Sequence, residues 1–319
     1  RILKIHGKRQ KNFKFTVENH QQNGVLLLNK PRGITSNAAL GRVKFLFKTK
    51  KAGHCGTLDP LASGLLPICL GEATKFSADL LNAPKKYRAT IQFGIATDSG
   101  DSEGVVILEK TAQFSRGALE KILPRFTGEI TQVPPMFSAL KFQGQPLYKL
   151  ARQGLEVERQ ARRISIFSLK LIDFDETKQS AILDVFCSKG TYIRALARDL
   201  GESLNNAAHL TALMRTAVAD FSLEDSVDLE TLQNAKSPAV FLKPIDFLLQ
   251  SLPRVDLENR LLPKFTCGNA VFLKSGDFLA EDSLCRVYAD NLFLGTAIFK
   301  NHALQPKRLV DLKKCVFPR

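Results

Sequence analysis

The sequence lacks any uninterrupted apolar run near the ~18 residues that a membrane-spanning helix needs. Its longest apolar runs, Val25–Leu28 and Leu65–Leu70, have the length of strands. The basic N-terminus also lacks the apolar segment of a secretory signal. We therefore expect a soluble, cytoplasmic protein that does not enter a membrane. Hydrophobic residues make up 44% and charged residues 24% of the chain, which is typical of a globular protein. The length of 319 residues is enough for one large and one smaller domain.

Closely spaced cysteines are missing as well. The chain has no Cys-x-x-Cys pair, and no two cysteines have the spacing of a zinc finger. This disfavours a structural zinc site and a disulfide scaffold, and we expect no metal. Free, mostly buried thiols are the simplest interpretation of the six cysteines, which are Cys55, Cys69, Cys187, Cys267, Cys285 and Cys315.

Acidic residues are almost absent from the first 51 positions, where 13 Lys and Arg accompany a single acid, Glu18. The whole chain has 46 basic and 31 acidic residues and a net charge of +15. This asymmetry indicates a polyanionic partner, most simply a nucleic acid. Residues 1–22 have the composition of a flexible basic arm, and the alternative is a solvated tail that aids solubility. A membrane-surface helix is disfavoured because residues 1–22 have no apolar stripe.

Strand patterns predominate in the middle of the chain. Residues 85–97 alternate between apolar and polar side chains, and residues 164–174 and 181–187 are predicted to pair. An acidic, glycine-containing turn over 97–104 and a strand-like piece around 138–142 are also predicted. The predicted helices include one that begins at a Ser36 cap and one that covers residues 191–204. Without a regular βαβ repeat, this order favours an α+β fold with a large mixed sheet and flanking helices. From about residue 254 the pattern changes to short strands and turns. We therefore expect one large domain over residues 23–250 and a small all-β domain over residues 251–319.

One loop stands out as a chemical site. Gly53-His-Cys-Gly-Thr-Leu-Asp-Pro60 contains two glycines and a proline, which exclude a regular helix. Such a loop holds the Asp59 carboxylate with little freedom. Taken alone, Asp59 is more simply explained as an Asx-turn residue before a proline.

The segment from Gly53 to Lys75 closely resembles the catalytic segment of the TruB-type tRNA pseudouridine synthases. Further motifs of that family follow in the same order, and together the resemblance runs from about Gly24 to Val218. These motifs are Gly24-Val-Leu-Leu-Leu-Asn-Lys-Pro-Arg-Gly33, Lys86-Tyr-Arg88, Ser138-Ala-Leu-Lys141, Tyr148-Lys-Leu-Ala-Arg-Gln-Gly154 and Ser188-Lys-Gly-Thr-Tyr-Ile-Arg194. The C-terminal residues match only loosely, through Gln305–Val310, a region that in the family forms a small RNA-binding barrel of the PUA type.

The resemblance implies a pseudouridine-synthase-like fold and the isomerisation of uridine 55 in the tRNA T loop, without cofactor or metal. It implies that Asp59 is the nucleophile and that Arg194 pairs with it. A neighbouring guanidinium would lower the pKa of such an aspartate and keep it ionised. A single carboxylate is enough for this reaction, whereas a glycosidase would need two. The matching tyrosine, Tyr87, is implied to stack on the flipped base and to serve in proton transfer, although its place in the strand also suits core packing.

The same resemblance implies supporting roles for other residues. His54 would fill the space that the extruded base leaves, and Tyr192 and Leu213 would line the uracil pocket. Each could instead be a loop or core residue. Lys30 and Pro31 are similar to family residues that support the active-site loop. One departure is Met214, which stands where many relatives have a second arginine and is expected to weaken one RNA contact.

The sequence is compatible with three functions. The first is the enzyme, acting alone as a monomer on the T arm of tRNA. The second is a tRNA-binding or tRNA-folding factor on the same scaffold that has lost catalysis. The third is a relative that depends on a guide RNA, which is disfavoured because residues 114–136 resemble the stand-alone bacterial enzymes.

Overall fold

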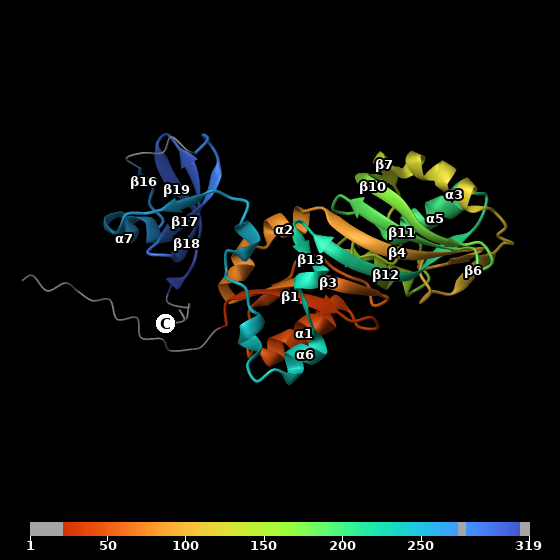
Figure 1. Cartoon of the computed structure of the whole chain (residues 1–319), viewed down its shortest axis with the longest axis horizontal. Coiled ribbons are helices and arrows are strands. Elements are labelled where there is room, and N and C mark those ends of the chain that lie inside the picture. The colour runs from red at the N-terminus through yellow and green to blue at the C-terminus, as the bar shows by residue number, and fades with distance from the viewer. Residues whose placement is uncertain (1–21, 274–278, 313–319) are drawn as a thin grey trace, which may run out of the picture. The chain divides into compact units, whose positions relative to one another are not determined.

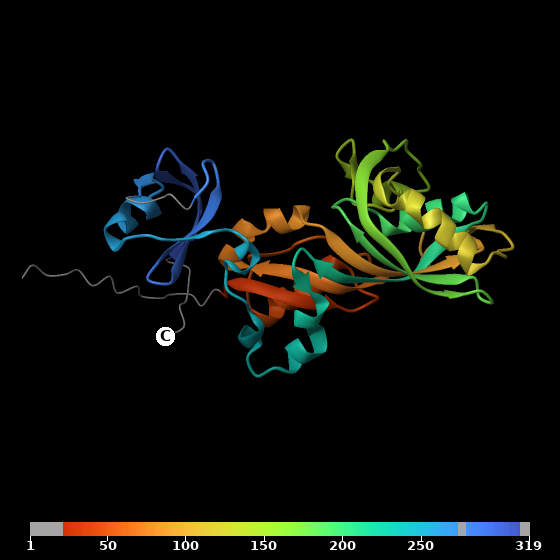
Figure 2. The same cartoon turned by 45° about the horizontal axis from the view of Figure 1, so that its top comes forward.

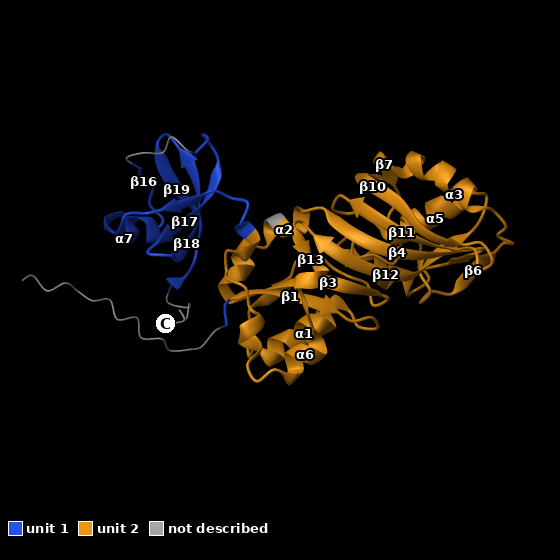
Figure 3. Ribbon diagram, viewed as in Figure 1, with its two compact units in different colours: residues 1–23, 249–319 blue, residues 24–248 orange. Residues whose placement is uncertain are grey.

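The computed structural model describes residues 22–273 and 279–312. The predicted basic arm over residues 1–22 therefore lies outside the described residues, apart from Gln22. Two compact units are formed, one by residues 24–248 and the other by residues from 249 onward (Figure 3). The boundary predicted from sequence, between residues 250 and 251, lies two positions further along. No helix in the described ranges is long and apolar enough to cross a membrane.

The first unit is built on one mixed sheet, as predicted (Figure 1). Most neighbouring strands are antiparallel, whereas β1 with β14 and β3 with β12 pair in parallel. Two short strands, β2 (Ala52–His54) and β13 (Phe221–Ser222), pair with β3 and β12 respectively. The main path across the sheet is β14 (Val227–Asp228), β1 (Gly24–Lys30), β3 (Ala62–Leu70), β12 (Ala208–Val218), β4 (Lys85–Phe93), β11 (Ser180–Cys187), β10 (Arg162–Asp175) and β7 (Gly128–Gln132).

Helices cover this sheet in two groups. Helices α1 (Ser36–Leu46) and α6 (Leu229–Asn234) pack on the β1–β3 end, and α3 (Arg116–Ile122) and α5 (Ile193–Ser203) pack on the β4–β11–β10 end. Figure 2 shows α3 and α5 beside the strands of their end. Two side chains, Tyr87 and Leu213, contact both apolar clusters, so they mark the seam between the two groups of helices. The candidate site lies at this seam.

The central strand β12 is the main element that the sequence patterns missed. It pairs with β3 on one side and with β4 on the other. Its pairing with β4 shifts register twice, between Leu210 and Ala212 and between Arg215 and Ala217. Each irregularity breaks the two-residue alternation that identifies a strand. For this reason the segment has no clear strand signature.

Three smaller expectations are corrected by the structure. The strand predicted over 85–97 is interrupted at Gly94, whose positive φ of 95° separates β4 from β5 (Ile95–Thr97). Helix α1 is capped by Thr35, whose side chain accepts a hydrogen bond from the Ala38 N–H, and not by Ser36. The strand predicted over 138–142 is reduced to β8 (Lys141–Phe142), which pairs with β9 (Gln145–Pro146).

Further helices and strands of the first unit lie, along the chain, between the strands of the large sheet. They are α2 (Ala78–Asn82), β6 (Val106–Glu109), which pairs with β5, and α4 (Leu147–Ala151). The second unit has a five-stranded sheet with its own apolar core and one short helix, α7 (Leu262–Thr266). This confirms the prediction of a small C-terminal β domain. Its strands, in sheet order, are β15 (Arg254–Asp256), β17 (Leu284–Ala289), β18 (Leu292–Lys300), β19 (Ala303–Leu309) and β16 (Val271–Phe272).

Candidate active site

The loop that carries Asp59 connects β2 to β3 and is attached to the start of α1. The Ser36 hydroxyl accepts a hydrogen bond from the Leu58 N–H at 2.8 Å and donates one to the Leu58 carbonyl at 2.9 Å. The Gly33 N–H donates to the Pro60 carbonyl at 2.8 Å. Both backbone neighbours of Asp59 are therefore held, while its side chain stays 41% exposed and open to a substrate. Ser36, predicted as a helix cap, acts as a loop anchor instead.

Arg194 approaches Asp59 from helix α5. A guanidinium nitrogen, Nη2, lies 2.9 Å from the Asp59 carboxylate. The same guanidinium donates to two backbone carbonyls, those of Ser99 at 2.8 Å and Phe137 at 2.6 Å. Arg194 is only 6% exposed, so its position is set by these contacts and not by solvent. The ion pair expected from the family motif is present in the structure.

A second carboxylate completes this arrangement. Asp101 lies 3.7 Å from Nε of Arg194 and is almost completely buried. Its side chain accepts hydrogen bonds from the Ser99 hydroxyl and the Glu103 N–H. The sequence predicts an acidic turn over 97–104 but gives Asp101 no role of its own. Only the contact between this turn and α5 distinguishes Asp101 from the other acids of the turn.

Arg215 is the other residue of the site that the sequence patterns missed. It lies on β12 and is 1% exposed. Its guanidinium donates to the carbonyls of Leu65, Thr57 and Gly56, the last two being in the Asp59 loop. A glycine permits this close approach: a Cβ on Gly64, which has a φ of 103°, would lie 2.4 Å from the Arg215 carbonyl oxygen. Arg215 thus ties the loop to the central strand.

Tyr87 and Leu213 lie side by side in the sheet, near this loop. Tyr87 on β4 is paired with Arg215 on β12, and Leu213 is paired with Ala89 and Ala62. Burial raises the pKa of Tyr87, so its phenol stays protonated at neutral pH. Both side chains are half-buried, and they can therefore pack against the core and still present an edge to the seam.

Tyr192 and His54 flank the site from two further elements. Tyr192 is the residue before α5, and its N–H and carbonyl both bind the side chain of Gln132. Burial raises the pKa of the Tyr192 phenol. His54 ends β2, and burial, together with the charge of Arg215, lowers the pKa of its imidazole. Its Nδ1 is buried and has no hydrogen-bond partner within the described part of the chain.

Lys30 ends β1, and Pro31 begins the turn that holds the loop. The Lys30 side chain is fully buried and donates to the carbonyls of Pro31 and Ile34, at 2.8 and 2.7 Å. Burial lowers the pKa of Lys30 to about 8. Because the turn it closes contains Gly33, which binds Pro60, Lys30 is connected to the Asp59 loop through backbone contacts. Pro31 itself is exposed.

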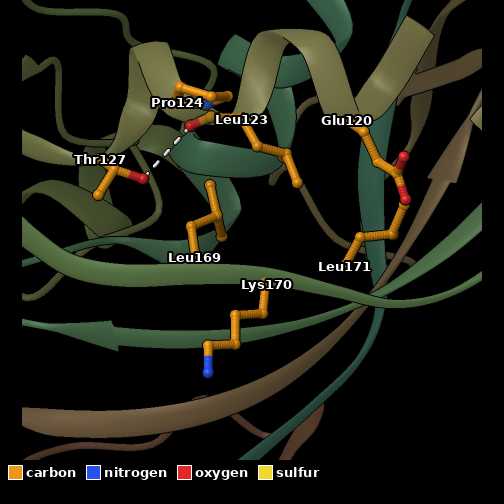
Figure 4. A pocket seen from close by; sticks show the side chains of 7 residues that line it. All are labelled: Glu120, Leu123, Pro124, Thr127, Leu169, Lys170 and Leu171. Carbon is orange, nitrogen blue, oxygen red and sulfur yellow. Dashed lines mark hydrogen bonds between the residues drawn. The ribbon is translucent and has the colours of Figure 1, made fainter. Parts of the chain in front are cut away.

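A separate hollow of about 690 Å³ lies between α3 and β10 (Figure 4). Its walls include Glu120, Leu123, Leu169 and Lys170. None of the residues predicted for the site lines it. At the Asp59 seam, in contrast, a loop, a helix and the central strand bring an acid and two arginines together.

The fold is shared with chains in solved RNA–protein and protein assemblies. A structure of a Cbf5-Nop10-Gar1 complex matches with a TM-score of 0.67 and 21% identity, covering 95% of this chain and 94% of that chain. A structure of an H/ACA RNP bound to a substrate RNA containing 2′-deoxyuridine also matches with a TM-score of 0.67 and 21% identity, covering 91% of this chain and 86% of that chain. At this identity the likeness shows the fold alone. The family model for the N-terminal domain of TruB family pseudouridylate synthases matches residues 44–193 and defines the class of protein.

The rest of the chain and its full-length relatives define the family. Models of two TruB C-terminal regions match residues 194–250 and 253–310. The tRNA pseudouridine synthase B of Dechloromonas aromatica is 50% identical over 297 residues, covering 92% of this chain and 97% of the relative. That of Chromobacterium violaceum is 53% identical over 250 residues, covering 78% and 81%. The chain therefore belongs to the TruB family of tRNA pseudouridine synthases, and the predicted enzyme class, an isomerase, is confirmed.

Proposed function

We propose that this protein converts uridine 55 in the T loop of tRNA to pseudouridine, with Asp59 as the nucleophile. The observation that carries the proposal is the 2.9 Å ion pair between the half-exposed Asp59 carboxylate and the buried Arg194 guanidinium. A carboxylate held in this way is oriented by a charge-assisted hydrogen bond and open on one side. The sequence motifs around both residues match the family in order and spacing.

The chemistry needs one carboxylate and no redox step. Asp59 attacks C1′ of the uridine, or stabilises that centre while a proton leaves C2′, and the N1–C1′ bond breaks. The uracil then turns and C5 bonds to C1′, as the Asp59–C1′ bond breaks on the first route or as the proton returns to C2′ on the second. The proton lost from C5 is balanced by the proton that N1 gains. Substrate and product have the same atoms, so no co-reactant is consumed. Both routes use Asp59 in the same position, and both need the freed uracil to stay in the site.

The neighbouring residues have distinct parts in this scheme. Arg194 orients Asp59 through Nη2, and Asp101 lies near Nε of the same guanidinium. The Tyr87 ring stacks on the flipped uracil, and its phenol, which burial keeps protonated, serves in proton transfer. Leu213 and Tyr192 form the other walls of the uracil pocket.

Access to the base requires its extrusion from the T loop, because the reacting C1′ is otherwise shielded. His54 lies where β2 leads into the Asp59 loop and is neutral at physiological pH, because burial and the Arg215 charge lower its pKa. A neutral imidazole can replace the extruded base in the stack without adding charge. Lys30 and Pro31 support the loop through the Gly33–Pro60 contact and take no chemical part.

We further propose that the protein acts as a monomer on tRNA alone, without a cofactor, metal or guide RNA. The test is direct: unmodified tRNA is incubated with the purified protein, and pseudouridine is mapped along the RNA. We expect modification at position 55 only. Modification elsewhere, or only after a second RNA is added, would overturn this proposal.

The role of Asp59 is tested by Asp59→Asn, which keeps the shape of the side chain but removes its charge. We expect turnover to be lost while tRNA affinity changes little. Asp184→Asn is the matched control, because Asp184 is a half-exposed acid paired with an arginine, Arg88, away from the loop. If wild-type protein binds tRNA tightly but forms no pseudouridine, the protein is instead the catalytically silent tRNA-binding factor.

A further inference from the structure

The first described elements of the chain carry an unbalanced positive charge. Residues 22–51 contain seven Lys and Arg and no Asp or Glu. Three of these cations have contacts that occupy them: Lys30 is buried on backbone carbonyls, Arg32 donates to the Thr211 carbonyl, and Lys51 pairs with Glu72. The other four make no ion pair with any described residue, and all lie on or just after α1. They are Arg42, Lys44, Lys48 and Lys50.

A large aromatic ring lies among these four cations. Phe45 is 83% exposed, although the inward face of α1 is well packed through Ala39 and Val43. Arg42 is three positions before Phe45 on α1, so its side chain neighbours the Phe45 ring on the helix surface, and Lys48 follows two residues after the end of the helix. We call Arg42, Lys44, Phe45, Lys48 and Lys50 the α1 cationic patch. The patch combines a free stacking surface with four unneutralised charges.

The position of this patch connects it to the site. Ser36, in the first turn of α1, is bonded to Leu58 in the Asp59 loop. Phe45 is nine residues further along the helix, which is about 14 Å at 1.5 Å per residue. A tRNA bound at Asp59 therefore has nucleotides within reach of the α1 cationic patch.

We propose that the α1 cationic patch binds an unpaired nucleotide of the tRNA outside the T arm, with Phe45 stacked on its base. This rests on the proposed action on tRNA. An aromatic ring needs an unstacked base, and paired stems offer none. The four cations neutralise the phosphates on either side of that base. Stacking and charge neutralisation are the combination by which proteins hold single-stranded RNA.

Two simpler explanations account for only part of the patch. Cations near a helix C-terminus interact favourably with the helix dipole and stabilise the helix. This explains Lys44 and Lys48 but does not explain an exposed Phe45. A membrane-surface helix would bury several apolar residues in the lipid, whereas Phe45 is the one large apolar side chain that α1 leaves exposed. Lys48 also has a φ of 48°, a conformation in which glycine or asparagine is usual, so the end of α1 carries a cation where an uncharged residue would be the ordinary choice.

The chain has no tryptophan, which makes a site-specific test available. Phe45→Trp introduces a single indole at the patch, and stacking on a base quenches its fluorescence. The probes are full-length unmodified tRNA and an isolated T-arm hairpin, each added to the Asp59→Asn protein so that turnover does not interfere. Phe167→Trp is the matched control, because Phe167 is also an exposed phenylalanine, 52% accessible, on the separate strand β10.

We expect tRNA to quench the indole of the Phe45→Trp variant strongly while the hairpin does not, and neither RNA to quench the control variant. Quenching by the hairpin as well would place the contact inside the T arm and overturn the proposal. No quenching by tRNA, or quenching by anionic vesicles in place of RNA, would also overturn it. In parallel, Phe45→Ala should weaken tRNA binding about tenfold, within the range of one stacking contact, and leave hairpin binding unchanged.

The charges are tested by the double variant Arg42→Gln with Lys48→Gln. The slope of the logarithm of tRNA affinity against the logarithm of salt concentration should become shallower by about two, because two phosphate contacts are lost. The matched double variant is Lys121→Gln with Arg125→Gln, two exposed cations of the same unit, which should leave the slope unchanged. Equal slopes for the two double variants would overturn the proposal. Pseudouridine formation in the T-arm hairpin by wild-type protein is measured separately, so a failure of the proposed enzymatic function is distinguishable from a failure of this surface.

Discussion

Removal of the Arg215 guanidinium is the sharpest test of how the Asp59 loop is held. Arg215→Met keeps the length and apolar stem of the side chain but leaves the carbonyls of Leu65, Thr57 and Gly56 without their donor. The Leu65 carbonyl is buried, so water cannot replace the guanidinium there, whereas the contacts at Thr57 and Gly56 are only partly buried. We therefore expect one fully unsatisfied acceptor and two that are partly rehydrated.

The magnitude follows from these three contacts. A buried unsatisfied polar group costs roughly 1–3 kcal/mol, and each partly hydrated carbonyl adds a fraction of that. Against this, methionine no longer buries a cation, which offsets part of the loss. We expect a net decrease of about 2 kcal/mol in the free energy of unfolding. Activity should fall further than stability alone predicts, because the Gly56–Thr57 backbone leads directly to Asp59.

The measurements are urea unfolding followed by circular dichroism and hydrogen exchange of the loop peptide. The urea midpoint should fall at an unchanged slope, and the Leu58 amide, bonded to Ser36 in the wild type, should exchange faster. The control is Arg88→Met, which removes an exposed arginine paired with Asp184 and should cost less than about 1 kcal/mol. If Arg215→Met is as stable as Arg88→Met, or if loop exchange is unchanged, Arg215 does not hold the loop.

Four further outcomes are expected. Asp101→Asn should lower kcat about tenfold or more with little change in KM, because Arg194 loses the contact that orients it; a larger effect on KM would contradict this positioning role. Burial lowers the pKa of Lys30 from 10.5 to about 8. As the pH rises, the folded protein therefore releases this proton at a lower pH than the unfolded chain does. The free energy of unfolding should consequently rise between about pH 8 and about pH 10.5. Lys30→Met should lack that rise in pH-dependent urea unfolding, and an identical pH profile would refute the assignment. Deletion of residues 1–22 should weaken tRNA binding and flatten its salt dependence without slowing single-turnover chemistry at saturating enzyme, whereas an unchanged slope would make the arm a solubility tail. A chain ending at Leu252 should stay folded by circular dichroism and still modify a T-arm hairpin but bind full-length tRNA more weakly, and unchanged affinity would remove the C-terminal unit from the RNA-binding role.

Local patterns along the chain were sufficient to predict many of the helices and strands. The alternation in residues 85–93 and in the pair 164–174 and 181–187 reflects strands with one buried face, and the spacing of Ala39 and Val43 reflects a helix with one buried side. The two glycines and the proline around Asp59 excluded a helix there without reference to any other part of the molecule. Patterns of this kind depend only on near neighbours, so they can be read from the sequence.

Strand β12 shows where such patterns stop being sufficient. Its two register shifts suit it to lie between β3 and β4, but each shift interrupts the alternation that would reveal a strand. Its place in the centre of the sheet is decided by pairing with residues far away in the chain. The role of Arg215 depends on that pairing, and no local signal distinguishes it from a surface arginine.

The sequence by itself determined the family, the Asp59 loop and the expectation that Arg194 meets Asp59, because these depend on motifs of contiguous residues. The folded chain was needed to show that Asp101 lies beside Arg194, that Ser36 anchors the loop and that Arg215 joins the loop to β12. These contacts join residues 22 to 159 positions apart. The free energy of such contacts comes from burying charged and polar groups against specific partners, and the partners are chosen by the packing of the sheet and not by the chain on either side.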